Sequence, residues 1–245
     1  MRNGNDQRMS LFEHLGELRR RIFISAVAVL VGSVITYFYV DRILEILKGP
    51  VETLVFIAPQ EAFLVNLKLS FWGGVFLASP VIFFEVWVFV SVALREEEKR
   101  YLLLYGSLSF CSFVIGVTFA HLVVLPVGLK FLLSFTSGGL QPMLSVSKYI
   151  SFVLMLLIAF GLVFELPLVA FFLTKLGLIS PEFLTQKRKH ALIGVFIVAA
   201  ILTPPDVFTQ LLMAGPLLGL YEISIWVSRL AKRKEKIVSE AEVLE

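Results

Sequence analysis

Six stretches of mainly apolar residues divide the chain, at residues 22–40, 67–93, 101–125, 149–174, 191–203 and 207–228. A helix needs about 20 such residues to cross roughly 30 Å of hydrocarbon. The pattern therefore predicts an all-α, polytopic membrane protein with six transmembrane helices. We expect these helices to form a single domain over residues 1–230, followed by a charged tail over residues 231–245.

Prolines modify this pattern within the stretches and between them. Pro80 in the second stretch and Pro167 in the fourth each remove a backbone donor, so we expect both helices to be kinked. Pro204 and Pro205 end the fifth stretch and force a turn into the sixth. The fifth helix would be short, because about 15 residues rise only about 22 Å. The last two spans are thus predicted to form a short final hairpin.

The segments between the stretches also show local patterns. Apolar residues recur at helical spacing from Leu11 to Ile22, which predicts an amphipathic interfacial helix that continues into the first span. The long connections over residues 41–66 and 126–148 contain apolar residues suited to short helices at the interface. Gly177 is typical of a helix C-cap, and Ser180-Pro181 of the start of the next helix.

Composition and charge sharpen this interpretation. Hydrophobic residues make up 58% of the chain and charged residues 17%, against about 45–50% and about 25% in soluble domains. If both termini are cytoplasmic, 17 of the 22 Lys and Arg residues lie on the cytoplasmic side, as the positive-inside rule requires. We therefore predict a protein of the inner (cytoplasmic) membrane with both termini in the cytoplasm. The net charge of +3 needs no nucleic-acid partner.

No enzyme signature is present in the sequence. It lacks a nucleophile elbow, an HExxH motif, a Walker A motif and a dinucleotide fingerprint, and its three His and one Cys give no basis for a disulfide framework or a His/Cys metal site. We expect no catalytic residue, metal or cofactor. Gly215 and Gly219 fit a GxxxG pattern, which helix packing within the bundle explains.

Acidic residues are the remaining polar signals. Glu165 lies deep in the fourth stretch, where a carboxylate usually faces a bundle interior or a water-filled cavity. Glu85 and Glu222 lie nearer helix ends, where a functional role and local pairing are both open. Glu17 could simply pair with Arg21 at i,i+4. Glu96, Glu97 and Glu98 could likewise form a solvated turn.

The order of several short motifs resembles the TatC family, the multispanning subunit of the twin-arginine protein translocase. The motifs are His14-Leu15-Gly16-Glu17-Leu18-Arg19, Pro59-Gln60-Glu61-Ala62-Phe63, Pro80 to Phe89 with Trp87, Phe164-Glu165-Leu166-Pro167, and Leu202-Thr203-Pro204-Pro205-Asp206 followed by Gln210, Pro216 and Tyr221-Glu222. Together they cover nearly the whole chain in the order in which the family has them.

The resemblance implies a receptor for signal peptides that carry consecutive arginines. The matching positions are Glu17 and Glu98, with Arg19 and Phe89 nearby; Glu97 is the alternative to Glu98 in a run of three acids. Arginine presents a planar fork that a carboxylate can accept in bidentate fashion. Two acids on separate segments could therefore recognise two arginines, and lysine would fit less well.

The resemblance also implies partners and an energy source. TatA/TatB-type single-span proteins would dock at the fifth and sixth spans of a concave bundle, within an oligomeric complex driven by the proton motive force. Matching polar positions there are Thr203, Asp206, Gln210 and Glu222, and Glu165 would face the concave interior. The main alternative is a secondary transporter for a small solute, to which short, proline-interrupted spans and intramembrane acids would point. Against this alternative, the second half of the sequence does not repeat the pattern of the first half.

Overall fold

A computed structural model describes residues 11–49, 51, 54–91, 102–134, 143–202 and 207–243. The helices are α1 (Leu11–Tyr37), α2 (Val40–Lys48), α3 (Gln60–Val90), α5 (Leu102–Phe119), α6 (Leu125–Ser134), α7 (Val146–Val163), α8 (Leu166–Lys175), α9 (Pro181–Gln186), α10 (Arg188–Leu202) and α11 (Val207–Val243), with a π-helical turn, η2 (Ala120–Val124), between α5 and α6. Strands β1 (Leu54–Val55) and β2 (Leu144–Ser145) pair in parallel. This pair is a small addition to an otherwise helical fold.

A helix lies at each of the six predicted stretches. In the described part of the chain, four helical segments are long and apolar enough to cross a membrane: Gln60–Val90, Leu102–Ser134, Val146–Lys175 and Val207–Lys232. The pair α1–α2, bent by 82°, makes a fifth if it is counted as one span. Helix α10, with 15 residues, is shorter than these segments. The six-span count and the orientation of the chain therefore stay predictions.

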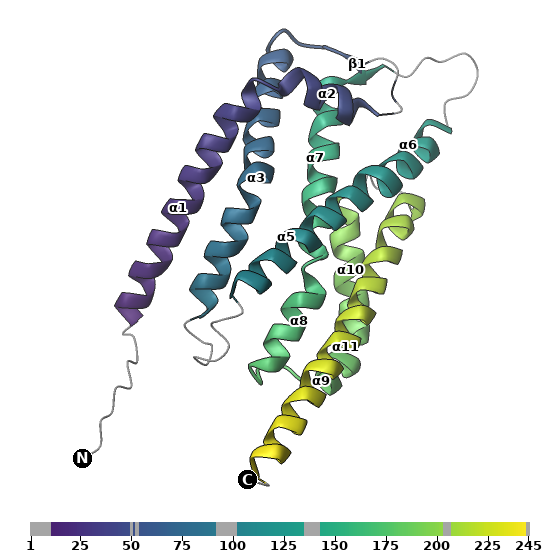
Figure 1. Cartoon of the computed structure of the whole chain (residues 1–245). Helices are drawn as coiled ribbons and strands as arrows, with labels where there is room; N and C mark the ends of the chain where they lie inside the picture. Colours follow the sequence, from purple (N-terminus) through teal and green to yellow (C-terminus); the bar gives the residue numbers. More distant parts are fainter. Residues whose placement is uncertain are drawn as a thin grey trace.

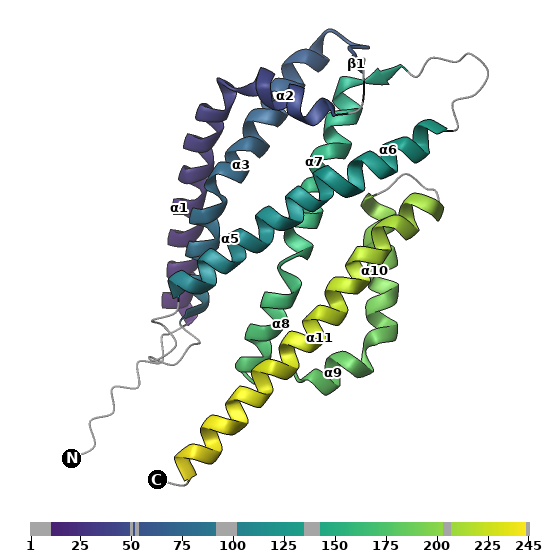
Figure 2. The same ribbon diagram turned by 45° about the vertical axis from the view of Figure 1, so that its right-hand side comes forward.

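The helices form an elongated bundle in which neighbours along the chain are not always neighbours in space (Figure 1). Helix α1 runs along α3, and α8 packs on α11. The continuous rod of α5, η2 and α6 crosses the bundle obliquely, and α2 lies across one end (Figure 2). The start of α1 and the end of α11 lie at the same, opposite end of the molecule.

Glycines allow α1 and α3 to approach closely. A Cβ atom added to Gly32 would lie 2.7 Å from the carbonyl oxygen of Gly74, and one added to Gly74 would lie 2.7 Å from the Cα of Ser33. Such separations are far below ordinary carbon contacts. The two backbones therefore touch, and they fix which faces of α1 and α3 oppose each other.

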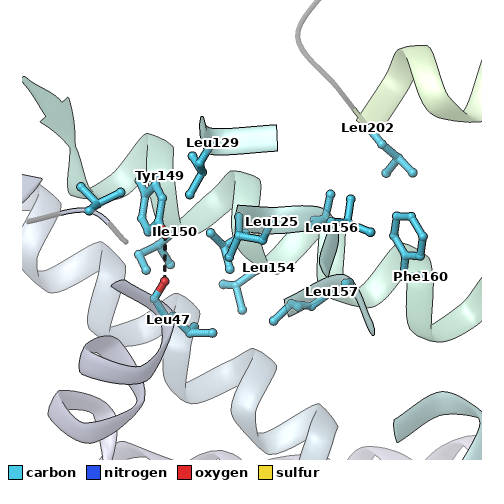
Figure 3. Close-up of a cluster of buried hydrophobic side chains, with 14 of the residues drawn as sticks. Leu47, Leu125, Leu129, Tyr149, Ile150, Leu154, Leu156, Leu157, Phe160 and Leu202 are labelled. Atoms are coloured by element: carbon cyan, nitrogen blue, oxygen red, sulfur yellow. Dashed lines mark hydrogen bonds between the residues drawn. The ribbon is translucent and has the colours of Figure 1, made fainter. Parts of the chain in front are cut away.

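Helix α7 is the centre of the apolar core (Figure 3). Its Ile150, Val153 and Phe160 are completely buried. Leu125 and Leu129 pack against it from the α6 segment, and Leu202 closes the cluster from the end of α10. The core thus connects the third, fourth and fifth predicted spans.

The third span is longer than the sequence predicts. It does not end at Leu125 but continues through Pro126 to Ser134, so the predicted external connection begins later. The reason is η2, in which the N–H of Leu125 donates to the carbonyl of Ala120, five residues back. This wider turn accommodates a proline that would clash in a regular helix.

Pro80 and Pro167, which lie in the second and fourth predicted spans, behave differently from each other. Helix α3 runs through Pro80 without a break, because the hydroxyl of Ser79 donates to the carbonyl of Phe76 (2.7 Å), which Pro80 leaves without its usual donor. The kink predicted in the second span stays a prediction. The fourth span is interrupted at Phe164–Glu165, between α7 and α8, as Pro167 predicts.

Local capping follows the sequence closely. Gly177 adopts φ +71° after α8, and the side chain of Ser180 accepts a hydrogen bond from the N–H of Phe183 at the start of α9. At the end of the bundle where α2 lies, the hydroxyl of Tyr149 donates to the carbonyls of Leu47 (2.9 Å) and Lys48 (3.0 Å). That contact ties α2, predicted as a short interfacial helix, to α7.

Candidate functional site

The candidate site lies where the start of α1 meets the end of α3. His14, Glu17 and Arg21 follow one another at spacings of three and four residues, so they share one face of α1. Glu85 and Phe89, four residues apart, share a face of α3. The close approach of the two helices turns these faces toward each other.

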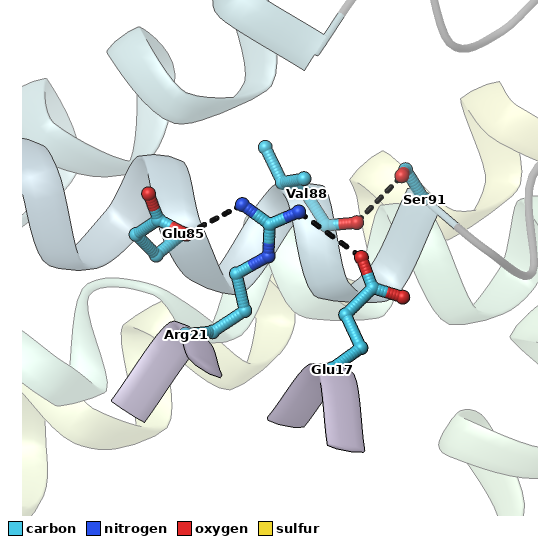
Figure 4. Close-up of polar contacts among 5 residues, drawn as sticks. All are labelled: Glu17, Arg21, Glu85, Val88 and Ser91. Atoms are coloured by element: carbon cyan, nitrogen blue, oxygen red, sulfur yellow. Dashed lines mark hydrogen bonds and ion pairs between the residues drawn. The ribbon is translucent and has the colours of Figure 1, made fainter. Parts of the chain in front are cut away.

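Arg21 joins the two helices through two ion pairs (Figure 4). Its Nη2 donates to Oε1 of Glu17 at 3.0 Å, and its Nη1 donates to Oε2 of Glu85 at 2.9 Å. The side chains of Arg21, Glu17 and Glu85 are only 20%, 19% and 10% exposed. The local pairing of Glu17 with Arg21 is therefore present, and Glu85 extends it across the helix interface.

An aromatic contact borders this cluster. The rings of His14 and Phe89 stack with centroids 4.5 Å apart and planes at 23°. Phe89 is thereby placed one helical turn from Glu85, beside the acids. Planar rings at this position offer an apolar wall next to two carboxylates.

The structure brings together some of the predicted recognition residues. Glu17 and Phe89 belong to the same site, whereas Arg19 is exposed and lies on another side of α1. Glu98 and its alternative Glu97 lie outside the described residues. Glu17 keeps one buried oxygen, Oε2, that has no hydrogen-bond partner among the residues described.

Glu165 occupies a separate place in the molecule. It sits at the break between α7 and α8 with only 9% exposure. The hydroxyl of Ser112 donates to the carbonyl of Phe164 at 2.7 Å and so satisfies one backbone group that the break exposes. Oε1 of Glu165 is buried and has no hydrogen-bond partner within the described part of the chain. Its carboxyl is thus buried at the interruption, away from the α1–α3 site.

The predicted polar positions of the final hairpin are mostly used inside the hairpin. Nε2 of Gln210 donates to the carbonyl of Phe196 at 3.1 Å, which ties α11 to α10. Glu222 pairs with Arg188 at 2.8 Å, and both side chains are about half exposed (50% and 47%). Thr203 and Asp206 lie outside the described residues.

A second ion pair connects α9 to α11 at the same end of the hairpin. Nζ of Lys232 donates to Oε2 of Glu182 at 2.8 Å. The hydrogen bond from Lys232, together with local hydrogen bonds at the start of α9, lowers the pKa of Glu182 to about 2. The carboxylate form is therefore favoured in the folded protein.

The GxxxG pair of α11 does not pack as predicted. Among the described residues, a Cβ atom added to Gly215 or Gly219 would meet no heavy atom within 4 Å. The interpretation that packing within the bundle explains these glycines is therefore wrong. The close approaches in this fold are made by other glycines, Gly32 and Gly74 among them.

The sequence did not predict the central place of two residues in this site. Arg21 is its centre, and Glu85 is its most buried acid. The shared helix faces, His14/Glu17/Arg21 and Glu85/Phe89, were the signal that could have revealed them. This spacing identifies the site only when it is known that these faces of α1 and α3 contact each other.

These features define a multipass helical membrane protein with a half-buried cluster of acids around one arginine at an end of its bundle. The family model of the Sec-independent protein translocase protein (TatC) matches residues 13–216. A TatC protein of Carboxydothermus hydrogenoformans is 48% identical over 235 residues, which are 94% of this chain and 97% of that protein. The TatC protein of Aquifex aeolicus is 45% identical over 243 residues, 95% of this chain and 100% of that protein.

A solved structure agrees with these relatives. The crystal structure of the twin-arginine translocase receptor TatC superposes with a TM-score of 0.83 at 44% identity, over 90% of this chain and 100% of that one. The chain belongs to the TatC family. It is thus a component of a protein translocase, and the small-solute transporter alternative finds no support.

Proposed function

We propose that this chain is the receptor and core subunit of a twin-arginine translocase in the inner (cytoplasmic) membrane, with both termini in the cytoplasm. It binds the arginine pair in the signal peptides of folded proteins and nucleates their export, which the proton motive force drives. Glu17 and Glu98 accept the two guanidinium groups, and Phe89 contacts the peptide beside them. Arg19 contributes from the exposed side of α1.

The state of Glu17 carries this proposal. Its carboxylate already accepts a guanidinium nitrogen at 3.0 Å, from Arg21. Its other oxygen is buried, with no partner in the described part of the chain. A half-buried carboxylate with a free acceptor is suited to a second arginine, because charge-assisted hydrogen bonds strengthen when they are shielded from water.

The test compares peptide binding by the purified full-length protein in detergent. A fluorescent signal peptide with Arg-Arg should bind Glu17→Gln about 10- to 100-fold more weakly than wild type, the equivalent of one hydrogen bond to a charged group. Glu182→Gln, which removes an exposed acid elsewhere, serves as the matched control and should bind normally. Unchanged binding by Glu17→Gln, or equal affinity of wild type for Lys-Lys and Arg-Arg peptides, would overturn the proposal.

We further propose that single-span TatA/TatB-type partners dock on the α10–α11 hairpin. Thr203, Asp206, Gln210 and Glu222 would supply polar contacts, and Glu165 would engage a polar group of a partner helix. Two observations support this. The glycines of α11 are open to close approach, and α10 rises only about 22 Å over its 15 residues, which is short for a bilayer and favours local thinning.

Cysteine cross-linking tests the docking surface in membranes that contain the partners. The native Cys111 is exposed and must first be replaced by alanine. A cysteine at exposed Leu211 of α11 should then cross-link to a single-span partner, and one at equally exposed Val31 of α1 should not. Equal labelling from both positions would reject the α11 surface.

A further inference from the structure

The cluster of Glu17, Arg21 and Glu85 contains one cation and two anions. Both ion pairs have hydrogen-bond geometry, at 3.0 Å and 2.9 Å, and all three side chains are at most 20% exposed (Figure 4). Because the groups are shielded from water, their charges are felt more strongly than those of surface residues. With all three groups ionised, the formal net charge of the cluster is −1.

Glu85 is the source of this net charge. Glu17 and Arg21 alone would neutralise each other, and a neutral pair offers little attraction to another guanidinium. Glu85 belongs to the opposite helix and is the least exposed of the three at 10%. It holds Nη1 of Arg21, so the arginine is shared between two carboxylates. Oε2 of Glu17 is left without a hydrogen-bond partner among the described residues.

We propose that Glu85 is a specificity-determining positioning residue of the signal-peptide site: it retains Arg21 and so leaves Oε2 of Glu17 without an internal partner, as an acceptor for one arginine of the peptide. This inference rests on the proposed function. On binding, the peptide guanidinium bonds to Oε2 of Glu17, and Arg21 remains paired with Glu85. The bound cluster then has two cations and two anions, so its charge is balanced.

Two variants that change the net charge of the cluster and then restore it test the role of Glu85. In Glu85→Gln, position 85 would offer Arg21 only a neutral acceptor, so the charge of Arg21 would be balanced by Glu17 alone. The Arg-Arg peptide should then bind at least about 10-fold more weakly, the loss of roughly one charged hydrogen bond. The double variant Arg21→Gln/Glu85→Gln removes one charge of each sign and restores the net charge of −1. It should bind the peptide within about threefold of wild type, less than a typical hydrogen bond contributes.

A merely structural role of Glu85 predicts a different result. If Glu85 only supported packing, the double variant would bind no better than Glu85→Gln. That result, or wild-type binding by Glu85→Gln, would overturn the proposal. Thermal unfolding of each variant checks that it is folded. If Glu85→Gln alone does not fold, a folded double variant that fails to bind the peptide also overturns it.

Two controls separate this inference from the proposed function. Glu17→Gln should abolish strong binding in the wild-type and in the double-variant background, and Glu182→Gln should leave it unchanged. If Glu17→Gln binds as wild type does, the proposed function itself fails. If Glu17→Gln loses binding while Glu85→Gln keeps it, only the role assigned to Glu85 fails.

Discussion

The contact between α1 and α3 leads to a sharp prediction at Gly74. Its replacement by alanine would place a methyl carbon 2.7 Å from the Cα of Ser33, and closer still to the Ser33 hydroxyl and N–H. Carbon atoms normally rest about 3.5–4.0 Å apart. The two helices must therefore separate locally by roughly 1 Å to relieve the contact.

The expected cost follows from two opposing terms. Overpacking typically destabilises by about 1–3 kcal/mol, and the upper half applies at Gly74 because backbone atoms of Ser33 cannot rotate away. Alanine recovers up to about 1 kcal/mol through its better helix propensity. The net loss should be about 1–2 kcal/mol, which lowers Tm by roughly 2–8 °C in a chain of this size.

Thermal unfolding followed by circular dichroism in one detergent measures this change. Gly215→Ala is the matched control, because its added methyl meets no heavy atom within 4 Å; its Tm should stay the same or rise slightly. Separation of the helices should also lengthen the 2.9 Å bond between Arg21 and Glu85 and weaken peptide binding. A Gly74→Ala protein that melts at or above the wild-type temperature would refute the argument from close approach.

Three further predictions concern the ties between helices. Tyr149→Phe removes the hydroxyl that donates to the last two carbonyls of α2, so the free energy of unfolding should fall by about 1–3 kcal/mol. An unchanged Tm would contradict this. Lys232→Ala should raise the pKa of Glu182 from about 2 toward 4.5, measured by NMR titration of the carboxyl. Because this pKa is lowered in the folded state, the stabilisation is present above about pH 4.5 and is lost as the pH falls toward 2. Arg188→Gln breaks a half-exposed pair with Glu222 and should change stability by less than about 1 kcal/mol; a larger loss would show that the pair is shielded.

Local features of this fold could be predicted from the sequence. The apolar stretches are long enough to require helices, and a helix is found at each of them. Gly177 and Ser180 act as caps because their chemistry suits only those places. The ion pair of Glu17 with Arg21 is also local, since the two residues lie one turn apart on the same helix.

Features that depend on how helices meet could not be predicted in this way. The partner of Arg21 across the interface, Glu85, is 64 residues away in the sequence. Their contact requires knowledge of which faces of α1 and α3 oppose each other, and the backbone approach at Gly32 and Gly74 decides this. The GxxxG pattern also led to the wrong prediction that Gly215 and Gly219 pack within the bundle. The motif alone does not show whether a neighbouring helix is present.

The π-helical turn holds one additional residue in the middle of a membrane span. The buried side of this rod passes through Gly116, Ala120 and Val124 and continues at Leu125, Gly128 and Leu129. Leu125, five residues after Ala120, shares this side because the wide turn holds one additional residue. Loss of a single exposed residue such as Leu122 would convert the turn to a regular helix, in which Pro126 would clash with the preceding turn. A one-residue deletion at this point would therefore be tolerated only if Pro126 were replaced as well.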